Sequence, residues 1–224
     1  MTARLFLYSA ALALCAGNAQ AARAEAPPKL VERPIAFSPA RLAATRAYAK
    51  LHYGSETIDI EPTMIVLHWT GVASLEASWK TFDRETLSAD RGDIAKGGDV
   101  NVSAHFLVAR DGAILRLMPE TRMARHVIGL NHAAIGIENV GGAGDKADLT
   151  AAQVRADAWL VRELKDRHPG IRTLIGHLES SRFKGKGPWK ELLPDYKTVK
   201  QDPGERFMAA VRAAVADLGL EEAP

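Results

Sequence analysis

Two histidines and one aspartate lie at positions where side chains from distant parts of this chain could meet. His68 ends the apolar run Met64–His68, and His177 ends the run Leu174–His177. Asp202 precedes a pattern typical of a helix start. Strand ends and helix starts meet at one edge of a sheet, where rigid backbone holds ligands that are far apart in sequence. Two neutral imidazoles and one carboxylate suit a tetrahedral zinc ion with one free position, and such an ion lowers the pKa of bound water to roughly 7.

Each of these three residues also has a structural explanation. A histidine on an apolar strand is most often a hydrogen-bonded core residue, and an aspartate before Pro203–Glu205 is most often a helix cap. Spacing alone leaves both readings open. Other common signatures are missing from the sequence, namely the Gly-x-Ser-x-Gly elbow, the phosphate-binding Gly-rich loop and the His-Glu-x-x-His helix. Serine hydrolases, P-loop enzymes and thermolysin-like proteases therefore lose support.

Short apolar runs bounded by turn residues predict the strands that would carry these side chains. Three buried strands are expected at Met64–His68, Ala134–Val140 and Leu174–His177. Two further runs within 102–117 flank Asp111 and Gly112, a pair that favours a β-hairpin.

Three segments have the pattern of amphipathic helices, and they cover 38–52, 150–167 and 202–218. Each begins with a capping signal: Ser38 before Pro39, and the capping-box patterns Thr150–Gln153 and Asp202–Glu205. Strands and helices therefore interleave. This order predicts an α/β fold, a single domain with a central mixed β-sheet flanked by helices.

The first residues have the pattern of a secretory signal. Arg4 precedes the apolar run Leu5–Ala16, which is too short for a bilayer span, and Ala19–Ala21 matches a signal-peptidase site. We therefore predict a signal peptide over 1–21 and an exported, periplasmic or secreted protein. The alternative, a buried N-terminal helix, would show polar positions at helical spacing. Cleavage would remove Cys15, the single cysteine, and leave histidine and carboxylate as metal ligands.

Length and charge narrow the remaining classes. With 224 residues, 47% of them hydrophobic, the chain can bury one sizeable core. We expect an N-terminal extension with a helix over 22–60 and one catalytic domain over 61–224. The 29 lysines and arginines against 27 acidic residues provide no field for nucleic acid or an anionic membrane. No second apolar segment is long enough for a membrane span, and no protein partner can be inferred.

Five runs resemble, in the same order, the motifs of the type-2 N-acetylmuramoyl-L-alanine amidases. They are Ile65–Thr70, Val102–Val108, Asn131–Glu138, Ile175–His177 and Lys200–Gly204. That family includes bacteriophage lysozyme-type amidases and peptidoglycan recognition proteins. The resemblance implies their α/β fold and one zinc ion per chain, bound by His68, His177 and Asp202. It also implies hydrolysis of the amide bond between N-acetylmuramic acid and L-alanine in peptidoglycan or muropeptides, an activity of cell-wall turnover.

The resemblance implies roles for four further residues. Glu138 would face the metal as proton carrier, and Lys200 would stabilise the oxyanion that forms on the reaction path. His126 and Asn131 would line the substrate groove. A glutamate within the apolar run 135–140 is costly to bury unless it is paired or functional, which supports Glu138 independently. The alternatives are an outward-facing Glu138, a solvated Lys200, and a loop-shaping role for His126 and Asn131.

Three departures or ambiguities accompany the resemblance. The phage-type branch has a tyrosine where this chain has Ala104, so no phenol receives a role. His105 is expected to pack or to support a ligand rather than to bind metal. The connection Leu178–Val199 is longer than in compact family members and is rich in cations. It would contact stem-peptide carboxylates or a glycan ring, or else be a solvated loop.

The mechanistic hypothesis is a hydrolysis without a covalent intermediate. Glu138 would take the proton of the attacking water and return it to the departing L-alanine amine. Two other functions remain open: a peptidoglycan-binding module without activity, and a zinc peptidase that cuts within the stem peptide. Binding members typically have an incomplete metal set, whereas this chain keeps both histidines, the aspartate and the glutamate. The sequence leaves open the choice between intact sacculus and released anhydro-muropeptides.

Overall fold

The computed structural model describes residues 26–142 and 148–224, so the predicted signal peptide and Cys15 lie outside the described residues. Within this part of the chain, the strands form one sheet in the order β1-β4-β3-β5-β2-β6. The β3–β4 pair is antiparallel and the other pairs are parallel. The predicted mixed sheet in an α/β domain is therefore confirmed.

The strands differ in length and burial. They are β1 (Leu30–Glu32), β2 (Met64–Trp69), β3 (Phe106–Val108), β4 (Ile114–Arg116), β5 (Ala134–Asn139) and β6 (Thr173–Gly176). The longest two, β2 and β5, are buried almost throughout and are aligned in register from Met64 opposite Ala134 to Trp69 opposite Asn139. Parallel strands that are covered on both faces have such continuous apolar runs, which is why the runs could be recognised in the sequence.

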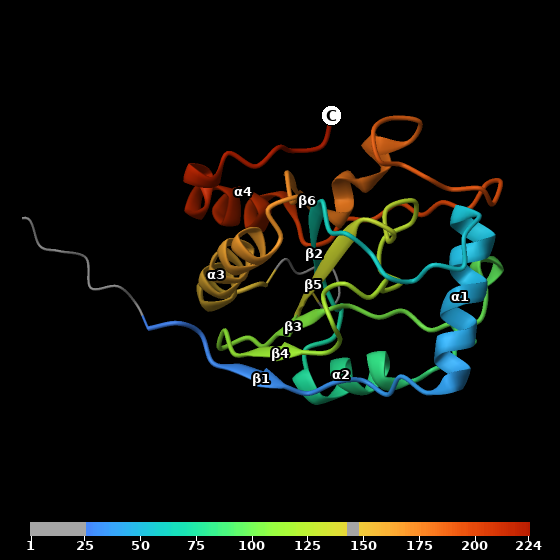
Figure 1. Cartoon of the computed structure of the whole chain (residues 1–224). Helices are drawn as coiled ribbons and strands as arrows, with labels where there is room; N and C mark the ends of the chain where they lie inside the picture. Colours follow the sequence, from blue (N-terminus) through green and yellow to red (C-terminus); the bar gives the residue numbers. More distant parts are fainter. Residues whose placement is uncertain (1–25, 143–147) are drawn as a thin grey trace, which may run out of the picture.

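Helices cover both faces of the sheet and one end of the molecule (Figure 1). They are α1 (Pro39–Tyr53), α2 (Leu75–Asp83), α3 (Ala151–Arg167) and α4 (Glu205–Ala214), with 3-10 turns η1 (Ala95–Gly97), η2 (His177–Phe183) and η3 (Ala216–Leu218). Residues of α3 and α4 pack on β2 and β5 in the largest hydrophobic cluster. Phe82 of α2 packs against Leu107 and Leu115 on the opposite face. No helix in the described ranges is long and apolar enough to cross a bilayer.

Two of the predicted helix starts are confirmed at atomic detail. The Ser38 hydroxyl accepts hydrogen bonds from the backbone N–H groups of Ala40 and Arg41. Thr150 and Gln153 make both hydrogen bonds of a capping box. These caps use only local backbone groups, so the sequence was sufficient to find them.

The predicted start of the last helix is wrong. The helix begins at Glu205 after Gly204, and no side chain caps it. The Asp202 side chain instead faces His68 and His177. The helix also ends at Ala214, before the separate turn η3 that contains Leu218.

The predicted hairpin exists, but its strands are shorter than the segment 102–117 suggested. The backbone N–H groups of Ser103 and His105 donate to Arg125 and Gly136 rather than across the hairpin. His177 likewise begins η2 instead of ending a strand.

Two elements were not predicted, the edge strand β1 and the helix α2. β1 pairs with β4 in parallel. Tyr48 and Tyr53 of α1 share a hydrophobic cluster with Ile58, Ile60 and Met123. The N-terminal extension therefore packs as part of the sheet and its core.

Candidate metal centre

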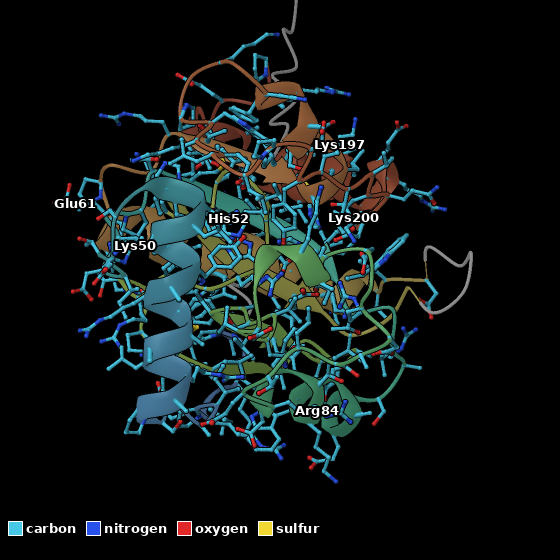
Figure 2. All side chains as sticks on the ribbon, turned by 90° about the vertical axis from the view of Figure 1, so that its right-hand side faces the viewer. Lys50, His52, Glu61, Arg84, Lys197 and Lys200 are labelled. Carbon is cyan, nitrogen blue, oxygen red and sulfur yellow. The ribbon has the colours of Figure 1, made fainter. Side chains whose placement is uncertain are left out.

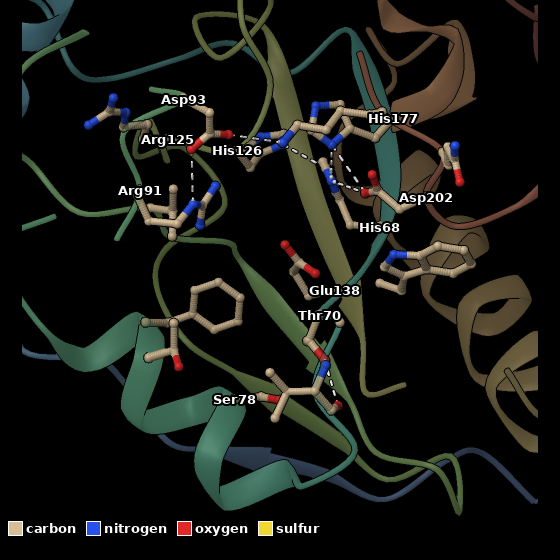
Figure 3. A pocket seen from close by; sticks show the side chains of 18 of the residues that line it. His68, Thr70, Ser78, Arg91, Asp93, Arg125, His126, Glu138, His177 and Asp202 are labelled. Carbon is tan, nitrogen blue, oxygen red and sulfur yellow. Dashed lines mark hydrogen bonds and ion pairs between the residues drawn. The ribbon is translucent and has the colours of Figure 1, made fainter. Parts of the chain in front are cut away.

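Three elements bring the predicted ligands to one edge of the sheet. His68 lies near the carboxyl end of β2, and His177 follows the last residue of the neighbouring strand β6. Asp202 lies in the turn that precedes α4. Figure 3 shows the three side chains pointing toward one another. The convergence predicted from strand ends and a helix start is thus what the structure shows.

The three candidate ligand atoms lie at nearly equal distances from one another. The Nδ1 atoms of His68 and His177 are 3.0 Å apart, and each lies 3.1 Å from Oδ2 of Asp202. Donor atoms that each lie about 2 Å from a tetrahedral metal ion are themselves about 3.3 Å apart. Two imidazole nitrogens and a carboxylate oxygen are also a ligand set that zinc prefers. These three residues could therefore hold a metal ion.

The protonation states favour metal binding. Burial, together with the neighbouring His177, lowers the pKa of His68 to about 4, so its imidazole is neutral at physiological pH. Burial works against the ionisation of Asp202, but its interactions with His177 and His68 outweigh this cost and hold the pKa of the carboxyl below its usual range. A neutral imidazole and an ionised carboxylate are the forms that bind metal.

His126 fixes the orientation of His68. Nε2 of His68 lies 3.0 Å from Nδ1 of His126, and Nε2 of His126 lies 3.2 Å from the carbonyl oxygen of Ala134. Because a carbonyl only accepts, Nε2 of His126 carries the hydrogen and its Nδ1 accepts from His68. His68 Nδ1 is then unprotonated and faces His177 and Asp202. This is the arrangement in which a metal-binding histidine donates its other N–H to a partner.

Gly136 makes room for this partner. A Cβ atom at this position of β5 would lie 2.8 Å from the His126 ring. His126, predicted to line the substrate groove, does line the cavity of the metal centre and in addition touches a ligand.

Glu138 stands beside the ligands with one oxygen atom unpaired. It lies opposite His68 in the β2–β5 register and is 9% exposed. Its Oε2 is buried and has no hydrogen-bond partner. Burial, reinforced by the charge of Asp202, raises the pKa of this carboxyl well above its usual value. A buried carboxyl without a partner is costly, and such groups concentrate at functional sites.

A cavity of about 460 Å³ opens over the ligands and Glu138. Lys200 lines it, and its Nζ lies 3.6 Å from Oδ2 of Asp93. Arg91 contacts the other oxygen of the same carboxylate at 3.4 Å. Two cations therefore share one carboxylate at the cavity wall. Figure 3 shows the contact of Arg91 with Asp93. Lys200 thus lines the same cavity as the three candidate ligands, and its role in stabilising an oxyanion stays a prediction.

Asn131 does not line this cavity but a much smaller one that shares His126, His177 and Lys200 with it. Its Oδ1 accepts from the backbone N–H groups of His126 and Val127 at 2.9 and 2.7 Å, and its Nδ2 donates to the Tyr48 hydroxyl. With 1% of its surface exposed, it holds the loop that carries His126. His105 is fully buried, and it donates to the Arg122 carbonyl and accepts from Gly136 N–H. It is thus a packing residue, as expected.

Several cavity residues had no signal in the sequence. Arg91 and Asp93 belong to a loop without periodicity, and Ser78 and Phe82 line the cavity from the unpredicted helix α2. Only knowledge of α2 could have suggested that part of the wall. Lys200 was predicted from the family motif, but no sequence pattern linked it to Arg91 and Asp93, which lie more than a hundred positions earlier in the chain.

A mixed sheet with two histidines, an aspartate and a buried glutamate at one edge defines an α/β protein with a site that could hold a metal ion and support hydrolysis. The family model described as N-acetylmuramoyl-L-alanine amidase matches residues 59–205. The match covers well over half of the chain. The chain therefore belongs to the N-acetylmuramoyl-L-alanine amidase family.

Two curated relatives illustrate the range of similarity. N-acetylmuramoyl-L-alanine amidase A from Achromobacter lyticus is 33% identical over 117 residues, which are 47% of this chain and 63% of that protein. The matched part thus spans slightly less than two thirds of this relative. The 1,6-anhydro-N-acetylmuramyl-L-alanine amidase AmpD from Escherichia coli is 29% identical over 180 residues, which cover 74% of this chain and 88% of AmpD.

Solved structures show the same fold. The endolysin N-acetylmuramoyl-L-alanine amidase LysCS from Clostridium intestinale superposes with a TM-score of 0.55 at 21% identity, over 88% of this chain and 99% of that one. A selenomethionine derivative of AmpD gives a TM-score of 0.51 at 24% identity, over 85% and 95% of the two chains. At these identities the likeness concerns the fold alone.

Proposed function

We propose that this protein is an exported, zinc-dependent amidase that cleaves the bond between N-acetylmuramic acid and L-alanine in peptidoglycan or muropeptides. Membership of the amidase family supports the reaction. The observation that carries the proposal is the placement of an unpaired Glu138 oxygen in the same cavity as three converging ligand atoms. The proposed export rests on the sequence pattern of residues 1–21.

His68, His177 and Asp202 would hold the ion, which when bound acts as a Lewis acid and makes water a stronger nucleophile at neutral pH. Glu138 accepts the proton of the water that attacks the lactyl carbonyl carbon. When the carbon–nitrogen bond breaks, the same proton passes from Glu138 to the nitrogen of L-alanine, which leaves as an amine. The raised pKa of Glu138 suits a group that must hold a proton between these two steps.

Lys200 has a role that is separate from proton transfer. The tetrahedral intermediate carries a negative charge on the former carbonyl oxygen. The substrate does not have this charge. An ammonium group on the cavity wall stabilises that charge specifically on the reaction path. The contact with Asp93 holds Lys200 near the ligands without burying it fully, since its side chain is 25% exposed.

The test combines product analysis with one variant. Purified protein should release stem peptides that begin with a free L-alanine amine, as identified by mass spectrometry. Glu138→Gln should lower the turnover number by about 10²- to 10⁴-fold, because proton transfer is lost, and the bound zinc should be unchanged. Shorter peptides would indicate a peptidase instead, and no product at full zinc occupancy would indicate a binding module. Turnover near wild type in the variant would remove Glu138 from the mechanism.

A further inference from the structure

A second cavity adjoins the metal centre. It measures about 430 Å³ and shares His177 and Val199 with the first cavity. Apart from Ile128 and His177, its lining comes from the segment 180–199, the long connection between the second histidine and the aspartate. We call this cavity the loop groove. Because it shares residues with the metal centre, a molecule whose reacting bond lies at His177 could extend directly into it.

The loop groove is built by specific contacts with the rest of the fold. The Trp189 ring lies against Gly129, where a Cβ atom would be 2.7 Å from the ring carbons. Oε1 of Glu191 lies 2.7 Å from Nδ1 of His52 in α1, and both side chains are nearly fully buried. The Tyr196 hydroxyl accepts a hydrogen bond from Arg125 at 2.9 Å. Three anchors along the segment therefore hold the groove open.

Much of the groove lining is apolar, and one of its residues has a free hydrogen-bond donor. Trp189, Leu193, Pro194 and Tyr196 contribute to the lining. Trp189 is half-buried, and its indole N–H has no hydrogen-bond partner among the described residues. A ligand that combines aliphatic groups with hydrogen-bond acceptors would match this lining.

Cationic side chains outnumber free carboxylates in the groove lining. Lys184 and Lys197 line the groove and form no ion pair within the described ranges. The segment 180–199 has three further cations outside the lining, Arg182, Lys186 and Lys190. Of its two carboxylates, Glu191 is bound to His52, which leaves only Asp195 to offset them. Figure 2 shows Lys197 and Lys200 on the face that also includes α1. This excess favours an anionic ligand.

The two arms of the proposed substrate differ in charge. On the muramic acid side of the scissile amide the sugar is uncharged, whereas the stem peptide bears free carboxylates and short aliphatic side chains. We propose that the loop groove binds the stem peptide, with Lys184 and Lys197 facing its carboxylates and Trp189 beneath it. This inference rests on the proposed function, and it assigns one arm of that substrate to a segment outside the catalytic residues.

A binding experiment tests the groove without catalysis. The probes are a free stem tripeptide that begins with L-alanine and its analogue with every carboxylate converted to a carboxamide. They are titrated calorimetrically into the full chain treated with a chelator, so that metal coordination cannot contribute. The wild type should bind the carboxylate form more tightly than the amide form. The double variant Lys184→Gln/Lys197→Gln should bind the carboxylate form about three- to tenfold more weakly and should not discriminate between the two.

The matched control is Lys29→Gln/Lys80→Gln, which removes the same charge near β1 and α2, at the other end of the sheet from the groove (Figure 1). It should bind like the wild type. Equal affinity of the wild type and the groove variant for the carboxylate peptide would overturn the proposal. An equal loss of affinity in the control variant would also overturn it. If the groove variant instead loses affinity only for phosphatidylglycerol vesicles, and not for the peptide, the cations bind a membrane surface and the proposal fails.

Kinetics separate this proposal from the proposed function. With peptidoglycan fragments, the groove variant should show a raised KM and an unchanged kcat, because the lost contact exists before and during the reaction. If the protein binds the tripeptide as expected but hydrolyses no muramyl amide, the proposed function fails and the groove assignment stands. Hydrolysis with the same KM in the wild type and the groove variant refutes the groove assignment alone.

Discussion

The strands that carry the metal centre and the segment that forms the loop groove are positioned in different ways. His68, Glu138 and His177 lie on or next to neighbouring parallel strands, whose register is set by continuous apolar runs. The segment 180–199 has no strand, and it is held by single contacts with α1, Gly129 and Arg125. The comparison teaches that the geometry of the metal centre depends on the packed sheet. The geometry of the loop groove depends on a few single contacts, which can change without unfolding the domain.

The largest effect is expected from the removal of a ligand. His177→Ala should abolish nearly all zinc binding and turnover, because two donors cannot replace three at a site with one open position. Bound zinc is measured by atomic absorption after dialysis, and the far-UV circular dichroism spectrum controls for folding. A variant with one zinc per chain would show that the strand-held cluster is not the metal centre.

A variant of His126 tests whether the metal centre also depends on the residue that contacts the candidate ligand His68. His126→Leu should weaken zinc binding about 10- to 100-fold, because His68 loses the partner that keeps its Nδ1 free. The affinity is measured by competition with a chromophoric chelator. His126→Gln, which retains an acceptor, should lose less. Equal affinities for both variants and the wild type would mean that His68 needs no partner.

Weakening the Glu191–His52 contact, which anchors the segment 180–199, should lower stability without changing zinc affinity. Glu191→Gln weakens the buried contact with His52 and should lower the free energy of unfolding by about 1–3 kcal/mol. Urea denaturation measures this loss. Hydrogen exchange should rise mainly in 180–199, and zinc affinity should stay at the wild-type value. A parallel loss of zinc affinity would contradict the separation of the two regions.

The smallest effect on the metal centre is expected at Asp157, whose side chain is fully buried. Burial raises its pKa to about 8, and its Oδ2 accepts a hydrogen bond from Asn139, which also donates to the carbonyl of His68. A folded-state pKa above the ordinary 3.8 gives stability that is complete below about pH 4 and is lost as the pH rises to about 8.

Asp157→Asn removes this dependence. The variant should become more stable relative to the wild type as the pH rises from about 4 to about 8, and the difference should shrink toward pH 4. Thermal unfolding across this pH range is the measurement. A difference that stays constant with pH would show that Asp157 does not titrate between the folded and unfolded states.

The sequence by itself determined the features that depend on near neighbours. Apolar runs located β2, β5 and β6, and short-range patterns located the caps at Ser38 and Thr150, because both depend on side chains within a few residues. The resemblance of ordered motifs indicated the ligands His68, His177 and Asp202, which spacing alone had left open.

Only the tertiary structure decided which distant groups meet. Asp202 has the sequence pattern of a helix cap, yet its carboxylate lies at the metal centre because β6 and β2 place both histidines within its reach. The contact of His126 with His68 and the groove formed by 180–199 have no local pattern. They depend on packing between residues many tens of positions apart, whose geometry follows from the assembled core and not from any single segment.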